Sequence, residues 1–393
     1  MTDRRYVVPF ALITSLFFLW GFARAILDVL NKHFQNALDI SLTQSSLIQV
    51  TTYLGYFLTA IPAGWFINRQ GYRRGVVFGL ALFALGSLMF IPGAAIGTFY
   101  AFLLPLFIIG CGLVFLETAA NPYASELGDK ATASSRLNFS QSFNGLGCLF
   151  ATYVVGQFLF NGSNEGGDVV VPYTLLGILV MVIAVVFSRV HLPEIKHEET
   201  EEDRIKDTRI MKLFKHHPMF VFGLFSLLAY EIAEISINSY FINFVTGQGW
   251  MDDNSASMVL TVALGFFMVG RFLGSWIMRR IPAERMLMYC SLGSVSCLGV
   301  VLLDIGHWSM YALIANYLFE AIMFPTIFSL SLQGLGNLTK SASSLLMMTP
   351  IGGCFFLLMG YVADQTNLVV PFLIPFIGYF IVLLYASELS RKS

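Results

Sequence analysis

Two acidic side chains lie inside segments that are otherwise strongly apolar. Asp28 belongs to the stretch 6–32 and Glu117 to the stretch 98–126. An isolated carboxylate in hydrocarbon is costly, so acids in such segments normally face a polar cavity and serve a function. Burial favours the neutral form of a carboxyl group, whereas a nearby cation favours the charged form. An acid that meets water on each side of a membrane in turn is therefore suited to load and release a proton.

Arg24 precedes Asp28 by four residues, the spacing at which two side chains meet on one face of a helix. Asp28 is therefore either a proton site that Arg24 gates or one half of a fixed salt bridge. Arg24 has a third role open to it, because its planar guanidinium suits bidentate contacts with a substrate carboxylate or hydroxyls. Glu117 has no basic residue within a helical turn and is either a proton carrier or a structural hydrogen-bonding acid. Asn121 and Pro122 follow it and predict an interruption of the helix there.

The stretch 217–245 carries a second set of polar side chains. Glu234 and Asn238 stand one helical turn apart and so share a face. Acid and amide groups suit a polyhydroxylated ligand, because each hydroxyl both donates and accepts hydrogen bonds. Trp20 and Tyr230 offer flat apolar faces for the ring of such a ligand, with packing or lipid contact as the alternative for each.

The elements that hold these residues are twelve apolar stretches. The chain of 393 residues is 56% hydrophobic and only 12% charged, against roughly 25% charged residues in a soluble domain. Because a spanning helix needs about 20 apolar residues, each stretch predicts a transmembrane helix. The stretches are 6–32, 44–67, 74–92, 98–126, 134–160, 169–189, 217–245, 255–278, 284–303, 308–335, 341–362 and 368–388.

Lysine and arginine fall almost entirely into alternate loops. Most of the 23 basic residues lie on one side of the predicted membrane, with the richest loop between Arg189 and Lys215, and the opposite side has at most Lys32. Cytoplasmic loops carry the excess of positive charge. Both termini are therefore predicted to be cytoplasmic, which requires an even number of helices.

The second half of the chain repeats the first. Gly64 matches Gly274 at an offset of 210 residues, and Glu117 matches Glu320 at an offset of 203. Such self-similarity indicates two related structural units. Glu320 is then either a second polar site or a partner for Arg271.

These features predict an all-α integral membrane protein whose twelve transmembrane helices form two pseudo-symmetric six-helix bundles. The bundles are expected over residues 1–190 and 217–393, joined by a charged cytoplasmic linker over 191–216. Because each bundle has six helices, both enter the membrane from the same side, and the repeat axis runs along the membrane normal.

The loop after the second stretch combines glycines with arginines at fixed spacing. Its members are Gly64, Asn68, Arg69, Gly71, Arg73 and Arg74. A glycine permits close helix contact, and arginines can bond helix-end carbonyls or acids of a neighbouring helix, which predicts a cytoplasmic conformational latch. The alternative is that the arginines only follow the positive-inside pattern. The loop resembles the signature of the major facilitator superfamily, with Asn68 where that family usually has aspartate.

More specific strings occur along nearly the whole chain. They are Phe17 to Gly21, Leu27 to Leu30, Leu116 to Pro122, Arg136 to Asn138, Gln141 to Asn144, Gly270 with Arg271, and Gly352 with Gly353. Together they resemble the L-fucose/proton symporter family of fucose, galactose and glucose transporters. The resemblance implies that Asp28 and Glu117 are the proton-linked acids and that the amides of Gln141 and Asn144 contact sugar.

The sequence departs from this family at Arg24 and Ala25, where the fucose transporter has asparagines beside the sugar, so fucose as the substrate does not follow. The expected function is import of a sugar by proton symport through alternating access. The alternatives are a sodium-coupled or uncoupled carrier of the same fold, a drug/proton antiporter, and a sugar sensor derived from a transporter. An enzyme is not expected, because the chain has no Walker loop, HExxH or GxSxG motif.

The remaining expectations concern ligands, partners and location. The five cysteines lie inside apolar stretches without metal-like spacing, so neither a metal nor a cofactor is expected, with sodium left open as a coupling ion. The expected partners are a sugar and the lipid bilayer, with no nucleic acid. The protein is expected to function as a monomer in the bacterial inner membrane.

Overall fold

The structure, a computed structural model, describes residues 7–126, 133–160, 169–190, 213–278, 280–335, 338, 342 and 345–392. Every regular element in these ranges is a helix. The chain divides into two compact units, unit 1 (Met1–Lys196 with Asp253–Thr261) and unit 2 (His197–Asp252 with Val262–Ser393). Most of the expected linker over 191–216 lies outside the described ranges, and its last four residues, 213–216, form a helical turn.

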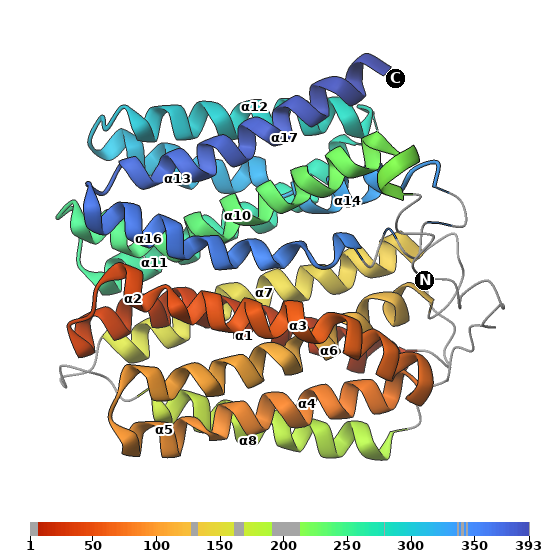
Figure 1. The fold of residues 1–393 in the computed structure, drawn as a ribbon, viewed down its shortest axis with the longest axis vertical. Helices are drawn as coiled ribbons and strands as arrows, with labels where there is room; N and C mark the ends of the chain where they lie inside the picture. Colours follow the sequence, from red (N-terminus) through yellow and green to blue (C-terminus); the bar gives the residue numbers. More distant parts are fainter. Residues whose placement is uncertain are drawn as a thin grey trace. The chain divides into compact units, whose positions relative to one another are not determined.

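Unit 1 contains several long helices and three short ones (Figure 1). Its elements are α1 (Val7–Leu38), α2 (Leu42–Ser45), α3 (Leu47–Gln70), α4 (Tyr72–Leu88), α5 (Phe90–Ile96), the 3₁₀ helix η2 (Phe99–Phe102), α6 (Leu103–Glu126), α7 (Ala133–Phe160) and α8 (Val170–Arg189). Helix α1 packs against α7 and α6, and α6 also contacts α3 and α4. The segments predicted to carry the acids and amides of the first half are therefore neighbours in space.

Unit 2 contains the remaining helices and most of α11. Its elements are α10 (Pro218–Gly247), α11 (Asp253–Ile277), α12 (Ala283–Leu302), α13 (His307–Glu320), α14 (Met323–Leu332), η6 (Thr349–Phe355), α16 (Phe356–Gln365), η7 (Val370–Phe372) and α17 (Leu373–Lys392). Helix α10 packs against α17, η6 and α14, while α12 packs against α13 and α17. Helix α10 thus contacts several other helices of unit 2.

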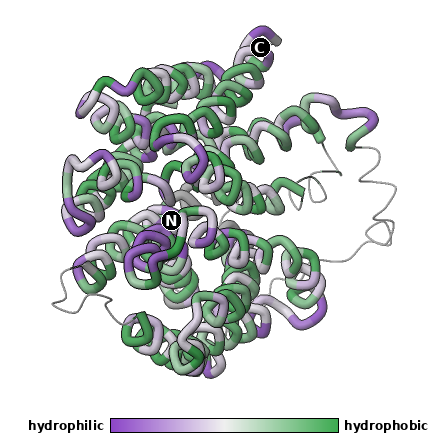
Figure 2. Tube along the Cα trace, turned by 60° about the vertical axis from the view of Figure 1, so that its left-hand side comes forward, coloured by the Kyte–Doolittle hydropathy of each residue, from purple (hydrophilic) through white to green (hydrophobic). Residues whose placement is uncertain are grey.

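The helices have the length and composition of membrane spans. Ten helical segments in the described ranges are long and apolar enough to cross a bilayer. The other two expected spans, 134–160 and 341–362, correspond to α7, which is 28 residues long, and to η6 with α16. Figure 2 shows hydrophobic residues along most of the helical length and hydrophilic residues gathered near helix ends and connections. The all-helical multi-pass fold follows from this pattern.

Two glycines bring the backbones of α1 and α7 into direct contact. A Cβ on Gly147 would lie 2.2 Å from the carbonyl oxygen of Phe18, and a Cβ on Gly21 would lie 2.1 Å from that of Asn144. Neither position leaves room for any side chain. Small residues allow this close approach, which replaces the hydrophobic effect as a source of helix association in lipid.

The predicted helix interruption after Glu117 is wrong for the first half and occurs in the second. Helix α6 runs without a break from Leu103 to Glu126, through Pro122. The matching segment of unit 2 divides after Glu320 into α13 and α14, ahead of Pro325. A proline removes one helical hydrogen bond, but whether the helix then ends depends on the contacts around it. The sequence pattern does not reveal these contacts.

We expect Gly147→Ala to destabilise the protein by about 1–3 kcal/mol, the usual cost of overpacking, because its Cβ would overlap the α1 backbone. The control is Gly299→Ala in α12, where a Cβ meets nothing within 4 Å, so better helix propensity leaves stability equal or raised. Thermal unfolding in one detergent compares the two variants. Equal midpoints for both would contradict the close contact of α1 with α7.

Candidate functional site

Polar side chains of α1, α3 and α6 meet inside unit 1. Arg24 is half-buried, and its Nε donates a hydrogen bond to the Tyr53 hydroxyl at 3.2 Å. The Tyr56 hydroxyl hydrogen-bonds the carboxyl of Glu117, a residue that is half-buried as a whole, and Arg24 is close enough to act on that carboxyl electrostatically. Asp28, also half-buried, lies one turn further along α1. We call these five residues the acid cluster.

The predicted amides of α7 border this cluster but differ in what they contact. Gln141 donates through Nε2 to Oδ1 of Asn121 at 3.3 Å, and Asn121 lies one turn after Glu117 on α6. Asn144 donates through Nδ2 to the carbonyl of Phe17 at 3.4 Å. Gln141 is therefore tied to the polar face that holds Glu117. Asn144 also has a structural role, because it links α7 to the backbone of α1.

The two aromatic residues predicted to stack on a ligand are packed inside the protein. Trp20 is 4% exposed and lies with its ring centroid 4.7 Å from that of Phe17. Tyr230 is 1% exposed, and its hydroxyl donates to the main-chain carbonyl of Glu320 at 3.3 Å. Both residues are therefore buried in this structure, and their stacking on a ligand stays a prediction.

Helices α1 and α10 expose equivalent positions in the two units. Residues 21–30 and 231–240, which are 210 residues apart, show the same order of buried and half-buried positions. In this register Arg24 corresponds to Glu234 and Asp28 to Asn238, and all four are half-buried. The Oδ1 atom of Asn238 is buried without a hydrogen-bond partner among the described residues. A ligand hydroxyl would satisfy this acceptor.

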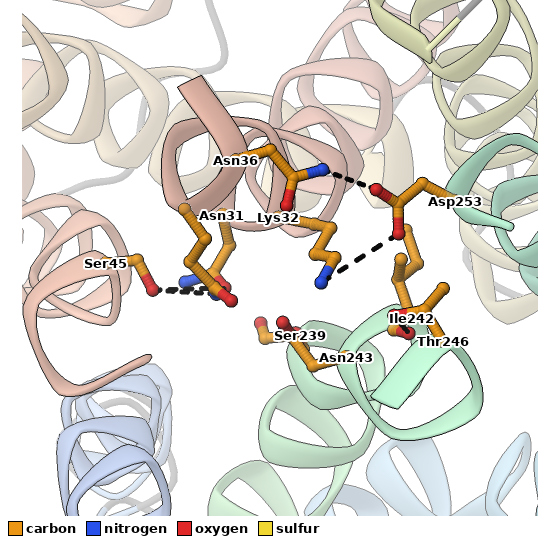
Figure 3. Close-up of polar contacts among 10 residues, drawn as sticks. Asn31, Lys32, Asn36, Ser45, Ser239, Ile242, Asn243, Thr246 and Asp253 are labelled. Carbon is orange, nitrogen blue, oxygen red and sulfur yellow. Dashed lines mark hydrogen bonds and ion pairs between the residues drawn. The ribbon is translucent and has the colours of Figure 1, made fainter. Parts of the chain in front are cut away.

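A further polar group lies toward the C-terminal end of α1 (Figure 3). Lys32 Nζ is 3.9 Å from Asp253 Oδ1, and Asn36 donates to the same carboxylate. On the other side of the helix, Asn31 and Ser45 share a hydrogen-bond network that ties α1 to α2. These contacts anchor the end of α1 and lie outside the acid cluster.

Comparison with known proteins assigns the family. A sequence model described as Major Facilitator Superfamily matches residues 13–356. The chain belongs to this superfamily. It is 33% identical to a glucose/galactose transporter of Brucella abortus, over 100% of the chain and 96% of that protein. It is 32% identical to the L-fucose-proton symporter of Escherichia coli, over 100% of the chain and 95% of that protein.

Solved structures agree with the assignment. The crystal structure of the major facilitator transporter FucP in its outward conformation is 31% identical, with a TM-score of 0.76 and coverage of 98% of this chain and 99% of that one. The inward-open xylose transporter of E. coli, at 13% identity and a TM-score of 0.76, shares the fold. The chain is therefore a multi-pass membrane transporter rather than an enzyme, as the sequence predicted.

The superfamily loop between α3 and α4 fulfils part of the predicted latch geometry. Gly71 ends α3 with a φ of 84°, a conformation that favours glycine. Arg73 donates through Nη2 to the carbonyl of Ser188 near the end of α8, which is the predicted helix-end contact. Arg69 instead lies over the ring of Trp65, with Cζ 4.2 Å from its centroid.

The other members of the loop whose side chains the structure describes do not make the expected contacts with neighbouring helices. A Cβ on Gly64 would meet nothing within 4 Å, so the close helix contact predicted there is absent among the described residues. Arg74 donates to Gln70 of its own loop. The side chain of Asn68 lies outside the described residues. The contact of Arg73 with α8 thus reaches beyond α3 and α4, the two helices that the loop connects, whereas the contact of Arg74 stays between these two.

Sequence reasoning missed Tyr53 and Tyr56, which contact Arg24 and Glu117 in this superfamily member. A signal was present, because two tyrosines three residues apart share one face of a helix. Nothing in the spacing, however, indicated that this face of α3 meets α1 and α6. The proximity of Arg24 to Glu117 was likewise hidden, since 93 residues separate them.

For the loop, we expect Arg73→Ala to lower stability by roughly 1 kcal/mol, because the carbonyl of Ser188 loses a charged donor. The matched control is Arg69→Ala, which removes the same charge from the same loop but only a stacking contact with an exposed Trp65. Thermal unfolding of both variants in one lipid and detergent mixture checks the prediction. A smaller loss for Arg73→Ala than for Arg69→Ala would refute it.

Proposed function

We propose that this transporter imports a sugar by proton symport through alternating access. The observation that supports the proposal is the acid cluster, in which the Glu117 carboxyl accepts a hydrogen bond from the Tyr56 hydroxyl close to Arg24. Relatives named as an L-fucose-proton symporter and as glucose/galactose transporters support both the proton and the sugar. Asp28 is the second proposed proton-linked acid.

The acid cluster offers a physical link between proton and substrate. As a carboxylate, Glu117 accepts the Tyr56 hydrogen bond and its charge is balanced by Arg24. As a neutral acid it needs no cation. When a sugar draws the Arg24 guanidinium toward its hydroxyls, the Glu117 carboxylate loses the positive charge that balanced it. Glu117 then binds a proton and becomes neutral. The two ligands are then coupled without touching each other.

Each unit provides half-buried groups suited to sugar hydroxyls. In unit 1 these are Arg24 and Gln141, with Asn144 as a further amide. In unit 2 they are Glu234 and Asn238, and the buried Oδ1 of Asn238 is an acceptor in need of a donor. Hydroxyl groups donate and accept at once, so mixed acid, amide and guanidinium groups suit them better than they suit an apolar cation.

We further propose a location in the bacterial cytoplasmic membrane with both termini in the cytoplasm. The clustering of lysine and arginine in alternate loops supports this orientation. A single chain contains both units, so we propose the monomer as the functional form.

Substrate choice tests the role of Arg24. We expect Arg24→Ala to change relative KM values within a panel of neutral, N-acetylated and acidic sugars by roughly 10-fold or more, because a charged hydrogen bond contributes about 1.5–3 kcal/mol. Tyr53→Phe is the control, since it keeps the guanidinium and removes one hydrogen-bond partner. Uptake into proteoliposomes measures the panel. An unchanged order and spread of KM values for Arg24→Ala would rule out substrate contact.

Proton coupling is tested by Glu117→Gln. We expect this variant to lose proton-driven accumulation of sugar while retaining counterflow exchange, because exchange needs the sugar site but no proton cycle. The control is Glu284→Gln, which changes an acid in the first turn of α12 and leaves accumulation intact. Both activities are measured in de-energised vesicles with an imposed pH gradient, with and without sodium.

The outcomes separate the alternatives. Uptake by the unmodified protein that ignores the pH gradient would refute proton symport, and uptake that requires sodium would favour a sodium-coupled carrier. Loss of counterflow as well as accumulation in Glu117→Gln would indicate that Glu117 contacts the sugar directly.

A further inference from the structure

Unit 2 contains a buried carboxyl group that the acid cluster of unit 1 does not involve. Glu320, the last residue of α13, is 0% exposed. Its Oε2 accepts hydrogen bonds from Asn316 Nδ2, at 2.8 Å, and from the Tyr379 hydroxyl. Its Oε1 has no hydrogen-bond partner among the described residues. An ionised carboxylate in this position would carry a large uncompensated desolvation cost.

The cation that acts on Glu320 forms its hydrogen bond with a different group. Arg271 of α11 acts electrostatically on Glu320, but its Nε donates to the main-chain carbonyl of Ala321 at 3.2 Å. Its Cζ also lies 4.6 Å from the ring centroid of Phe267. No ion pair joins Arg271 to Glu320 in the part of the chain that the structure describes. Arg271 therefore acts on Glu320 electrostatically in this conformation without a direct ion pair between the two described side chains.

The other groups around Glu320 do not supply a counter-charge. The titratable side chains that act on it or on its hydrogen-bonding neighbours come from α10, α12 and α17 and are Tyr230, Glu231, Glu234, Cys297 and Tyr379. All are neutral or acidic types. The negative charge of Glu234 opposes a second negative charge at Glu320. A neutral Glu320 is the form that this environment accepts.

The position of Arg271 depends on the break between α13 and α14. Pro325 has no N–H, so the Ala321 carbonyl four residues earlier lacks its usual helical donor. Arg271 supplies that donor instead. Broken helices of this kind line ligand sites in many transporters, because the freed backbone groups need partners. The guanidinium thus has two acceptors within one region, a carbonyl and a carboxyl group.

We propose that Glu320 is a further proton-binding site besides Glu117 and Asp28, neutral in this conformation and ionised when Arg271 turns from the Ala321 carbonyl to the carboxyl group. On ionisation the Oε1–H bond breaks, the proton passes to water, and the electron pair stays on the carboxylate, whose charge Arg271 balances. Asn316 and Tyr379 hold Oε2 in both forms. The site takes a proton whatever the transported solute is, so it stands apart from the proposed sugar symport.

Infrared spectroscopy of the full chain in lipid nanodiscs tests the site directly. We expect a carboxylic acid C=O band at neutral pH that is lost in Glu320→Gln and retained in Glu117→Gln. In the unmodified protein this band disappears as the pH is raised, and in Arg271→Gln the disappearance is abolished because the compensating cation is gone. The isosteric, neutral glutamine preserves the contacts of Oε2 to Asn316 and Tyr379 in shape.

Three results would overturn the proposal. One is a band of equal intensity in the unmodified protein and in Glu320→Gln, which means that Glu320 carries no proton. Another is a pH response that Arg271→Gln leaves unchanged. If Glu320→Gln does not fold, Tyr379→Phe serves instead: loss of its hydrogen bond to Oε2 must shift the C=O band to higher frequency, and an unshifted band contradicts the assignment.

Discussion

Hydrocarbon provides no hydrogen bonds, so every polar group that enters the bilayer needs a partner within the protein. The break between α13 and α14 shows how this constraint decides the role of side chains. The carbonyls of Glu320 and Ala321 accept hydrogen bonds from Tyr230 and Arg271, respectively. Tyr230 and Arg271, whose side chains could bind a ligand, are therefore hydrogen-bonded to the backbone. Their availability depends on the shape of a neighbouring helix.

The two repeats share the order of buried and half-buried positions but differ in the side chains at the half-buried positions. Helices α1 and α10 bury equivalent positions in the same order, yet Arg24 and Asp28 in one unit correspond to Glu234 and Asn238 in the other. The burial pattern is set by how each helix packs in its bundle, which both units share. The side chains at the half-buried positions differ between the units.

The repeated acids of α6 and α13 show the same divergence. Both precede a proline by five residues, but α6 continues through its proline and α13 ends. Glu117 is half-buried beside a tyrosine and an arginine, whereas Glu320 is fully enclosed. The two equivalent acids therefore lie in different physical environments.

The sequence by itself determined the class of fold and most of the candidate residues. Apolar stretches of spanning length, the placement of basic loops and the internal repeat depend on periodic composition, and composition is visible along the chain. An acid in such a stretch, such as Glu117, can be recognised from the sequence as a candidate functional residue. The free-energy cost of placing it in hydrocarbon does not depend on its neighbours. Tertiary structure alone decided the partners. It brought Tyr56 and Arg24 to Glu117, enclosed Trp20, and broke the helix after Glu320 rather than after Glu117. These outcomes depend on contacts between helices far apart in the chain, and spacing along one helix carries no information about which face meets which neighbour.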